Sequence, residues 1–475
     1  MTRSLDNVKK LRETLSARAD FGIIGDGTDE TVKIMAAVEA ARSQGKALIF
    51  SKPDVKYVYN TPIMLSTGMS IIGEGGPPNR WRSNVKNVYF EYTGAGAAIF
   101  IKPGLGQYAD SIRISNIEIN GVNSQAGCVG LYMDNTTGDF IEGIQVDNCT
   151  FFNFPINQIR HEGTCFDVTF RRVQVGNPDR TAENSVFIAG GQPSQITFDD
   201  CYLLAHTAGQ WCVFIVNCDD ARFINGTIAP YNGGAGANGV VAAGGLFIYG
   251  THVEGVYNTQ TTTVGIQYIG SNGAFISPAL CALFGTGVKI GDGTSAVARG
   301  WTIAGNIGNN NIAAGGTADI YITGNGSRVG TILSAGFANS NPTIVNERLT
   351  ANGVDEVTMQ HLGYYKGRVI ASDGNPTTPS LSVGSIGGMY NTGSSVGIAV
   401  SGIQQLDVRD TDIRTLKKIY PGTPAGAFQA DAGMYAGTGI PSNALGGNGD
   451  FYLRADGGAA TSIYHKEGGV WVGRA

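Results

Sequence analysis

The residues best suited to acid–base chemistry gather between positions 200 and 254, near the middle of the 475-residue chain. The candidate catalytic side chains are Glu254, Asp219, Asp220, His252 and Asp200. Two carboxyl groups flanking a glycosidic bond can hydrolyse it, with retention at a separation of about 5 Å and inversion at about 6.5–9.5 Å. We expect Glu254 to act as the acid opposite Asp219 or Asp220, while His252 orients or tunes it.

Aromatic side chains near these groups predict a carbohydrate site, because aromatic rings bury the apolar faces of sugar rings. The candidate substrate-binding residues are Tyr202, His206, Trp211, Tyr231 and Tyr249. His161 and Glu162 form a second candidate acid–base pair. A structural interpretation competes with these assignments, since aspartates also stabilise sharp turns. It applies to Asp199–Asp200 and Asp219–Asp220, and it makes Glu254 and His252 plain surface residues.

A lyase is the alternative chemistry. It needs a base, for which His252 or Tyr202 is suitable, and a cation that neutralises a uronate. The candidate cations are Arg171, Arg172 and Arg222. The sequence contains no dense aspartate cluster for calcium and no Cys/His metal spacing, so we predict no metal and no cofactor. The seven cysteines are expected to be buried free thiols.

Composition favours many short strands joined by tight turns. Glycine is abundant, with 70 residues, and only 15% of residues are charged. The net charge of −5 and the lack of a basic stripe argue against a nucleic-acid partner. No apolar run is long enough to cross a bilayer, and the N-terminus lacks the apolar core of a secretory signal. We therefore expect synthesis in a host cytoplasm and no membrane insertion.

An internal repeat begins near residue 111 and indicates a solenoid. Residues 112–119 align with residues 144–151, and later copies start at Val168, Ile196, Ala221, Leu246 and Ala274. Offsets of about 24–32 residues are typical of solenoid coils. Each copy predicts two strands around a sharp corner, and a further strand closes the coil, so we expect three strands per coil.

The repeat also predicts which side chains stack. The expected interior ladder is Ile114, Val146, Phe170, Phe198, Phe223, Ile248 and Ile276. A second interior set is Ile117, Cys149, Val173 and Cys201. An outward column is expected to contain Glu118, Thr150, Gln174, Tyr202, Thr227, His252 and Leu280.

A capping segment precedes the repeat. Thr28 or Asp29 is expected to cap a helix whose apolar face is Ile34, Ala37, Val38 and Ala41 and which ends at Gly45. Together with Gly25-Asp26-Gly27, Phe50, Tyr57 and Gly73-Glu74-Gly75, this segment resembles the N-terminal cap of the pectate-lyase-like β-helix superfamily found in bacteriophage tailspikes. Residues 51–54 depart from that pattern. Residues 437–473 resemble a short β-motif at the C-termini of phage tail fibres and spikes.

The resemblance implies an all-β chain: a right-handed single-stranded parallel β-helix with an N-terminal capping helix and a small β-rich C-terminal region. We expect a lead-in or stem at 1–20, the cap and first coils at 21–110, the β-helix at 111–345 and a C-terminal region for trimerisation or carbohydrate contact at 346–475.

The implied function is that of a homotrimeric tailspike of the virion. It would attach to a tail baseplate or adaptor protein and hydrolyse bacterial capsular polysaccharide or lipopolysaccharide O-antigen. The alternatives are a tail fibre that binds glycan without cleaving it, and a polysaccharide lyase.

Overall fold

The computed structural model describes most of the chain and divides it into two units, Met1–Ile370 and Ala371–Ala475. The described residues are 14–75, 88–103, 107–136, 140–176, 183–190, 194–205, 209–230, 236–255, 262–292, 298–308, 316–323, 328–333, 343–346, 356–359, 368–371, 381–382, 387–391, 395–400, 403–409, 413–415, 434–458 and 462–474.

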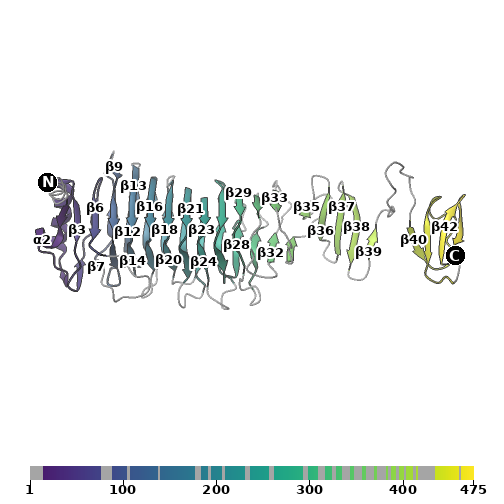
Figure 1. Ribbon diagram of the computed structural model, residues 1–475, viewed down its shortest axis with the longest axis horizontal. Coiled ribbons are helices and arrows are strands. Elements are labelled where there is room, and N and C mark those ends of the chain that lie inside the picture. Colours follow the sequence, from purple (N-terminus) through teal and green to yellow (C-terminus); the bar gives the residue numbers. More distant parts are fainter. Residues whose placement is uncertain are drawn as a thin grey trace, which may run out of the picture. The chain divides into compact units, whose positions relative to one another are not determined.

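The first unit is a parallel β-helix in which three ladders of parallel strands run along the stacked coils (Figure 1). The first ladder contains β5 (Ile63–Leu65), β8 (Ala97–Ile101), β12 (Val129–Asn135), β15 (Asn157–Gly163), β18 (Val186–Ala189), the beginnings of β21 (Trp211–Ile224) and β23 (Asn238–Tyr249), β25 (Val264–Tyr268), β28 (Thr286–Ile290), β30 (Ala318–Ile322), β32 (Thr343–Asn346) and β34 (Arg368–Ala371).

The second ladder follows the first along each coil. It contains β1 (Thr14–Ser16), β3 (Ala47–Phe50), β6 (Ser70–Gly73), β10 (Arg113–Ser115), β13 (Phe140–Asp147), β16 (Cys165–Arg171), β19 (Ile196–Asp199), the ends of β21 and β23, β26 (Ala274–Ser277), β29 (Ala298–Ile303), β31 (Arg328–Ile332) and β33 (Glu356–Met359). The short strand β9 (Tyr108–Asp110) pairs with the beginning of β13.

The third ladder closes the coil as a sheet of ten strands. It contains β2 (Asp26–Asp29), β4 (Lys56–Tyr59), β7 (Val88–Tyr92), β11 (Ile117–Asn120), β14 (Thr150–Phe152), β17 (Gln174–Gly176), β20 (Tyr202–Ala205), β22 (Thr227–Pro230), β24 (His252–Glu254) and β27 (Leu280–Ala282). The prediction of a parallel β-helix with three strands per coil is therefore confirmed.

The predicted interior ladder is also confirmed. Register places Ile114, Val146, Phe170, Phe198, Phe223, Ile248 and Ile276 opposite one another in turn, and all are buried. The rings of Phe170 and Phe198 stack at 4.7 Å, and those of Phe198 and Phe223 at 5.0 Å. Identical positions on successive coils lie one strand spacing apart, so equal side chains stack without a gap.

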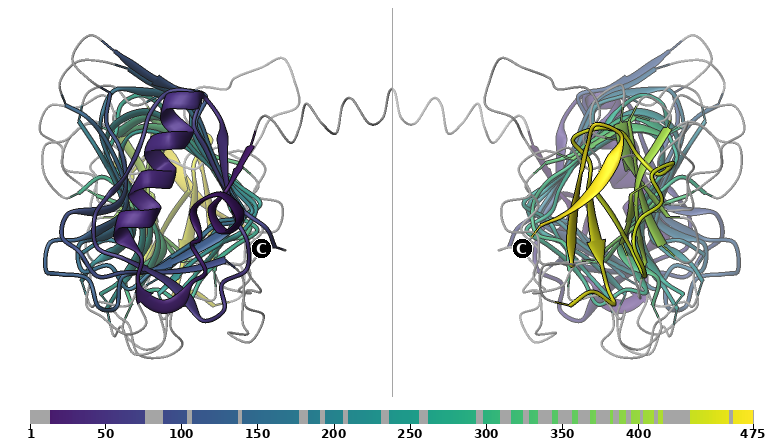
Figure 2. Two further views of the ribbon diagram at one scale, coloured as in Figure 1. Left: turned by 90° about the vertical axis from the view of Figure 1, so that its left-hand side faces the viewer. Right: turned by 90° about the vertical axis from the view of Figure 1, so that its right-hand side faces the viewer.

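A helix covers the N-terminal end of the coils (Figure 2). This helix, α3 (Thr31–Gln44), ends at Gly45 with φ 60°, as predicted. Its predicted apolar face, Ile34, Ala37, Val38 and Ala41, is buried. The capping prediction was partly wrong, because the N-cap residue is Glu30, although Asp29 Oδ1 accepts a hydrogen bond from the Thr31 backbone N–H.

Two boundaries differ from the sequence-based expectation. Leu15 lies in β1, which pairs with β3, and the short helix α2 (Ala17–Phe21) follows; the end of the lead-in therefore belongs to the β-helix. The rest of the expected stem, residues 1–13, lies outside the described residues. At the other end the ladders continue through β33 and β34, so the β-helix extends past residue 345.

The second unit contains two small sheets. One is antiparallel and contains β35 (Leu381–Ser382), β36 (Gly387–Asn391), β37 (Ser395–Val400), β38 (Ile403–Arg409) and β39 (Ile413–Thr415). The other contains β40 (Met434–Gly437), β41 (Phe451–Arg454), β42 (Ile463–Glu467) and β43 (Val470–Arg474). Tyr452, Tyr464 and Trp471 form the small core of this second sheet.

Cysteines serve as core residues. All seven are buried free thiols, as predicted, and burial raises the pKa of Cys149 and Cys201 to about 12. Within the described ranges, no three His, Cys, Asp or Glu side chains gather as metal ligands would. Neither helix of the described chain has the length and apolarity needed to span a bilayer.

Replacing Phe198 tests the interior stack. We expect Phe198→Ala to lower the free energy of unfolding by about 3–5 kcal/mol, because it opens a cavity between two rings that cannot close up. Urea unfolding followed by circular dichroism measures the loss. The control Thr197→Ala changes the neighbouring outward side chain and should cost less than about 1 kcal/mol. Equal losses in the two variants would contradict the stack's role.

Candidate functional site

The third ladder presents the outward column that the repeat predicts. Register places Glu118, Thr150, Gln174, Tyr202, Thr227, His252 and Leu280 opposite one another on successive strands. His252 and Glu254 are exposed on β24, and Tyr202 is half-buried on β20. This face therefore carries part of the predicted cluster.

The structure does not bring Glu254 together with Asp219 or Asp220. The two aspartates lie in β21 at the corner between the first and second ladders, whereas Glu254 lies on the third ladder. The four residues of β21 that follow the corner span about 13 Å. That length exceeds the separation that either hydrolytic mechanism allows.

Both aspartates also have partners of their own. Asp219 Oδ1 accepts a hydrogen bond of 3.1 Å from Asn272 Nδ2. Asp220 accepts from Arg222 through both carboxylate oxygens, and the two form an ion pair. These contacts favour the structural interpretation of the pair.

Asp200 occupies a turn position. The corner between the second and third ladders contains a left-handed residue in six successive coils, and these residues are Asn116, Asn148, Arg172, Asp200, Asn225 and Gly250, with φ between 50° and 65°. Aspartate and asparagine tolerate this conformation better than most residues. Backbone conformation therefore explains Asp200 without a catalytic role.

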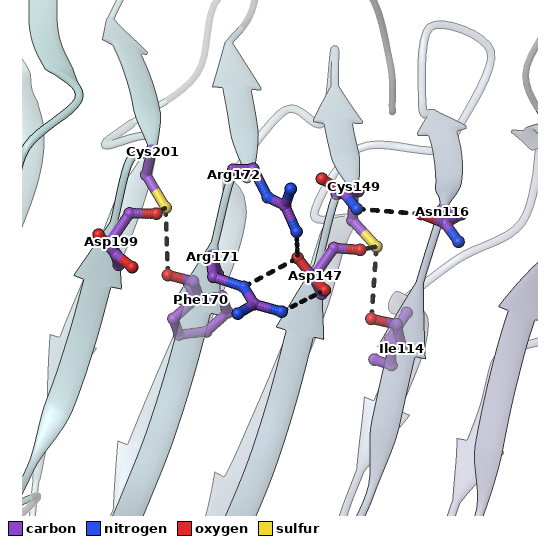
Figure 3. Close-up of polar contacts among 10 residues, drawn as sticks. Ile114, Asn116, Asp147, Cys149, Phe170, Arg171, Arg172, Asp199 and Cys201 are labelled. Atoms are coloured by element: carbon purple, nitrogen blue, oxygen red, sulfur yellow. Dashed lines mark hydrogen bonds and ion pairs between the residues drawn. The ribbon is translucent and has the colours of Figure 1, made fainter. Parts of the chain in front are cut away.

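The corner carries an ion-pair cluster (Figure 3). Arg171 and Arg172 both bind Asp147, with N–O distances of 2.7 and 3.0 Å. Burial opposes ionisation of Asp147, but the hydrogen bonds from the two guanidinium groups outweigh it and hold the pKa of this carboxyl below its usual value. The candidate cations for a uronate are therefore paired, and Arg222 is likewise paired with Asp220.

The predicted sugar-binding residues lie on different faces. Trp211 begins β21 on the first ladder, and Tyr249 ends β23 on the second. Tyr249 is 54% exposed and stacks beside Phe247 at 6.3 Å. His206 and Tyr231 lie outside the described residues.

Strand alternation separates the His161–Glu162 pair. His161 points inward on β15 and is fully buried, and burial lowers its pKa to about 4. Glu162 points outward, opposite Asp134 on β12. Each of these carboxylates has a cation, since Arg160 binds Glu162 and Lys102 binds Asp134, both at 2.8 Å. Although burial opposes ionisation, these bonds keep both pKa values low.

Glu91 and Glu118 form a carboxyl pair that sequence reasoning missed. Glu118 lies opposite Tyr89, and Glu91 lies opposite Asn120, so the two glutamates are diagonal neighbours on adjacent strands, β7 and β11. A strand spacing of about 4.8 Å and a two-residue rise of about 6.6 Å place their Cα atoms about 8 Å apart. Inverting glycosidases need about 6.5–9.5 Å between the two carboxyl groups, a distance that these side chains can reach from that Cα spacing.

The two glutamates have opposite environments. Glu91 forms an ion pair with Lys56 Nζ at 2.7 Å and accepts a hydrogen bond of 3.0 Å from Asn123 Nδ2. Burial raises the pKa of Glu118. Its register neighbour Thr150 has a buried hydroxyl with no hydrogen-bond partner among the described residues. Two carboxyl groups with such different surroundings have the pattern of an acid and a base.

The pair could have been found only in part. Glu118 was placed in the outward column, but the strand that carries Glu91 lies before the repeat and follows no copy of it. The raised pKa of Glu118 depends on burial by neighbouring coils, which the sequence alone does not reveal.

Known proteins resemble this chain in fold and not in sequence. No protein-family model matches the chain, and no curated protein does. ORF18 of Geobacillus virus E2 is 13% identical, with a TM-score of 0.50 over 99% of this chain and 87% of the viral protein.

Two further solved structures align less closely. A tailspike of the Acinetobacter baumannii bacteriophage Fri1, described as a capsular polysaccharide depolymerase, is 12% identical over 76% of this chain and 64% of its own, with a TM-score of 0.44. The A-module of the Azotobacter vinelandii mannuronan C-5 epimerase AlgE6 is 12% identical over 75% and 95%, with a TM-score of 0.38. The parallel β-helix fold is thus shared with the viral protein ORF18, and a fold by itself defines no reaction.

Because His161 is buried, with a lowered pKa, the free energy of unfolding should depend on pH. The folded pKa lies below the ordinary value of 6.5, so the unfolded chain binds the extra proton and stability falls as the pH drops from about 6.5 to 4. This shift corresponds to about 3 kcal/mol. Urea unfolding at pH 7 and pH 4.5 should show a smaller loss in His161→Gln than in the wild type. The control His252→Gln, at an exposed histidine, should lose as much as the wild type. Equal losses in wild type and His161→Gln would contradict this assignment.

Proposed function

We propose that this chain is a bacteriophage tailspike that binds a bacterial capsular polysaccharide or O-antigen and hydrolyses its glycosidic bonds at Glu118 and Glu91. The observation that carries the proposal is the diagonal carboxyl pair on the third ladder, in which one group is desolvated and the other is held by a cation. The parallel β-helix, shared with a viral protein, supports it.

The two glutamates have separate roles. Glu118, whose pKa is raised by burial, donates its proton to the glycosidic oxygen as the bond to the anomeric carbon breaks. Glu91 accepts a proton from a water molecule, whose oxygen bonds to the anomeric carbon from the opposite face. Lys56 and Asn123 orient the carboxyl group of Glu91 by hydrogen bonds to its two oxygens. Cα atoms about 8 Å apart allow the two carboxyl groups a separation that leaves room for that water, so we expect inversion.

The rest of the third ladder fits a polymer. Tyr202, His252 and Glu254 lie further along the same outward face. On this proposal these side chains bind sugar units away from the cleaved bond. The paired state of Arg171, Arg172 and Arg222 gives the lyase less support.

Substitution of Glu118 tests the reaction. The purified chain is incubated with a panel of capsular and O-antigen polysaccharides, and chain length, reducing ends and absorbance of unsaturated products are recorded. We expect cleavage with new reducing ends, and a loss of about 10²–10⁴-fold in Glu118→Gln because the general acid is removed. Wild-type activity should also fall at high pH as Glu118 ionises. Glu39→Gln, on the surface of α3, is the control.

Three results would contradict the assignment. Full activity in Glu118→Gln would show that Glu118 is not the general acid. A comparable loss of activity in Glu254→Gln alone would support Glu254 as the acid, as the sequence predicted. Unsaturated products would indicate a lyase. Tight binding of a glycan without shortening of any polysaccharide would indicate a binding fibre.

The second sheet of the C-terminal unit supports a homotrimer. One face packs on the small core, and the other carries exposed apolar side chains interspersed with His465, Glu467 and Arg474. The apolar residues are Met434, Phe451, Leu453, Ile463, Val470 and Val472, between 37% and 51% exposed. Exposed apolar side chains gathered on one face of a sheet mark an interaction surface. We assign it to the other two subunits of a trimeric spike, whose attachment would be to a baseplate or adaptor protein.

Charges on that face should prevent assembly. We expect the double variant Phe451→Asp/Val472→Asp to shift the protein from trimer to monomer, because a buried unpaired carboxylate is costly. Size-exclusion chromatography with light scattering measures the mass. Ser442→Asp, at an exposed residue off this face, is the control. A trimeric double variant, or a monomeric wild type, would contradict the proposal.

A further inference from the structure

Exposed aromatic side chains are concentrated at one place on the β-helix. Tyr108, Phe140 and Phe166 are 62%, 37% and 36% exposed and come from the strands β9, β13 and β16 of successive coils. Tyr249 is the other exposed aromatic residue among the described part of the β-helix. Water contact for three adjacent rings is unfavourable, so the patch indicates a ligand or partner.

The three rings form a short row. Tyr108 lies opposite Phe140 in register, and their rings stack at 5.8 Å with an interplanar angle of 11°. Phe140 and Phe166 lie 5.7 Å apart and are tilted by 32°. Tyr108 ends the row and is the most exposed, so one face of its ring is open to a ligand.

Two pairs of outward aromatic rings on the first ladder differ from this row, because their faces are covered by one another and by a cation. Phe100 stacks on Tyr132 at 5.2 Å, and Phe187 stacks on Phe214 at 5.8 Å. The Arg160 guanidinium fills the place between the two pairs, 5.6 Å from Tyr132 and 5.1 Å from Phe187. Ring faces in that column contact one another, so it stabilises the coils.

Two carboxylates lie beside the open row. Asp110 and Glu142 are register neighbours on β9 and β13, about 4.8 Å apart along the helix axis. Glu142 lies opposite Phe166 on the other side. Within the described chain, neither carboxylate has a side-chain hydrogen bond or a cation. Both remain available as acceptors for hydroxyl or amino groups.

We propose that Tyr108, Phe140, Phe166, Asp110 and Glu142 form a second carbohydrate-binding subsite, selective for neutral or amino sugars. The aromatic rings cover the apolar faces of sugar units, while the carboxylates accept hydrogen bonds from their hydroxyl or amino groups. Acidic sugars are repelled. This inference rests on the proposed function, because the same polysaccharide is taken as the ligand.

A sugar suits the patch better than another protein chain. Covering the patch with an apolar protein surface would bury Asp110 and Glu142 without cations, which costs several kcal/mol per charge by general estimates. A glycan brings hydroxyl donors and leaves water around the carboxylates.

The subsite is separate from the proposed catalytic pair. It lies on β9 and at the beginning of the second-ladder strands β13 and β16, whereas Glu118 lies on the third ladder, after the strand Arg113–Ser115 and the corner at Asn116. Loss of the subsite should therefore weaken capture of the polymer and leave bond cleavage intact.

Removal of the Tyr108 ring tests the subsite. The full-length chain carrying Glu118→Gln, which should bind without cleaving, is applied to an array of bacterial polysaccharides with neutral, amino and uronic sugars. Binding constants for positive glycans are then measured by calorimetry, with and without Tyr108→Ala. We expect preference for neutral or amino glycans and at least a tenfold weaker binding constant in Tyr108→Ala. Val55→Ala, at an exposed apolar residue of the cap, is the control.

Each result decides the inference. An unchanged binding constant, preference for uronic polymers, or a change of oligomeric state in Tyr108→Ala would overturn it. If otherwise wild-type Tyr108→Ala cleaves with unchanged kcat and KM, the subsite fails while the proposed function stands. If the wild type neither binds nor cleaves any glycan, the proposed function fails and this inference fails with it.

Discussion

In-register stacking of parallel strands is the constraint on which this structure depends. Each strand hydrogen-bonds to the strand one coil before and one coil after it, so a residue always lies beside its equivalent in the next coil. Equal interior side chains then fill space continuously, as in the Phe170–Phe198–Phe223 stack. The corners repeat as well: in six successive coils one left-handed residue turns the chain from the second ladder to the third.

The same constraint determines what chemistry the surface can perform. Outward side chains on neighbouring strands are either direct neighbours, about 5 Å apart, or diagonal neighbours, about 8 Å apart. Asp134 and Glu162 are direct neighbours whose charges are neutralised by Lys102 and Arg160. Glu91 and Glu118 are diagonal neighbours, and among the described residues a cation binds Glu91. Burial raises the pKa of Glu118.

Sequence reasoning recovered the period of the coils and therefore both the interior ladder and the outward column. It did not predict which residues lie on the same face of the coil. A sequence repeat identifies residues that are neighbours along the helix axis, but it does not show on which ladder a distant segment lies. Asp219 and Glu254 are close in coil number and lie on different ladders. Glu91 precedes the sequence repeat, so its pairing with Glu118 was not predicted. The last coils have less regular spacing than the repeat, so the end of the β-helix was placed too early, at residue 345.

The stereochemistry of the cleaved product tests the central claim most directly. Proton NMR of the reaction, recorded within minutes of adding enzyme to a susceptible polysaccharide, identifies the anomer that forms first. The account predicts the inverted anomer, because Glu118 and Glu91 lie about 8 Å apart and admit a water molecule between base and sugar. A retained anomer would require a closer pair, and an unsaturated product would require a lyase; either result would contradict the assignment.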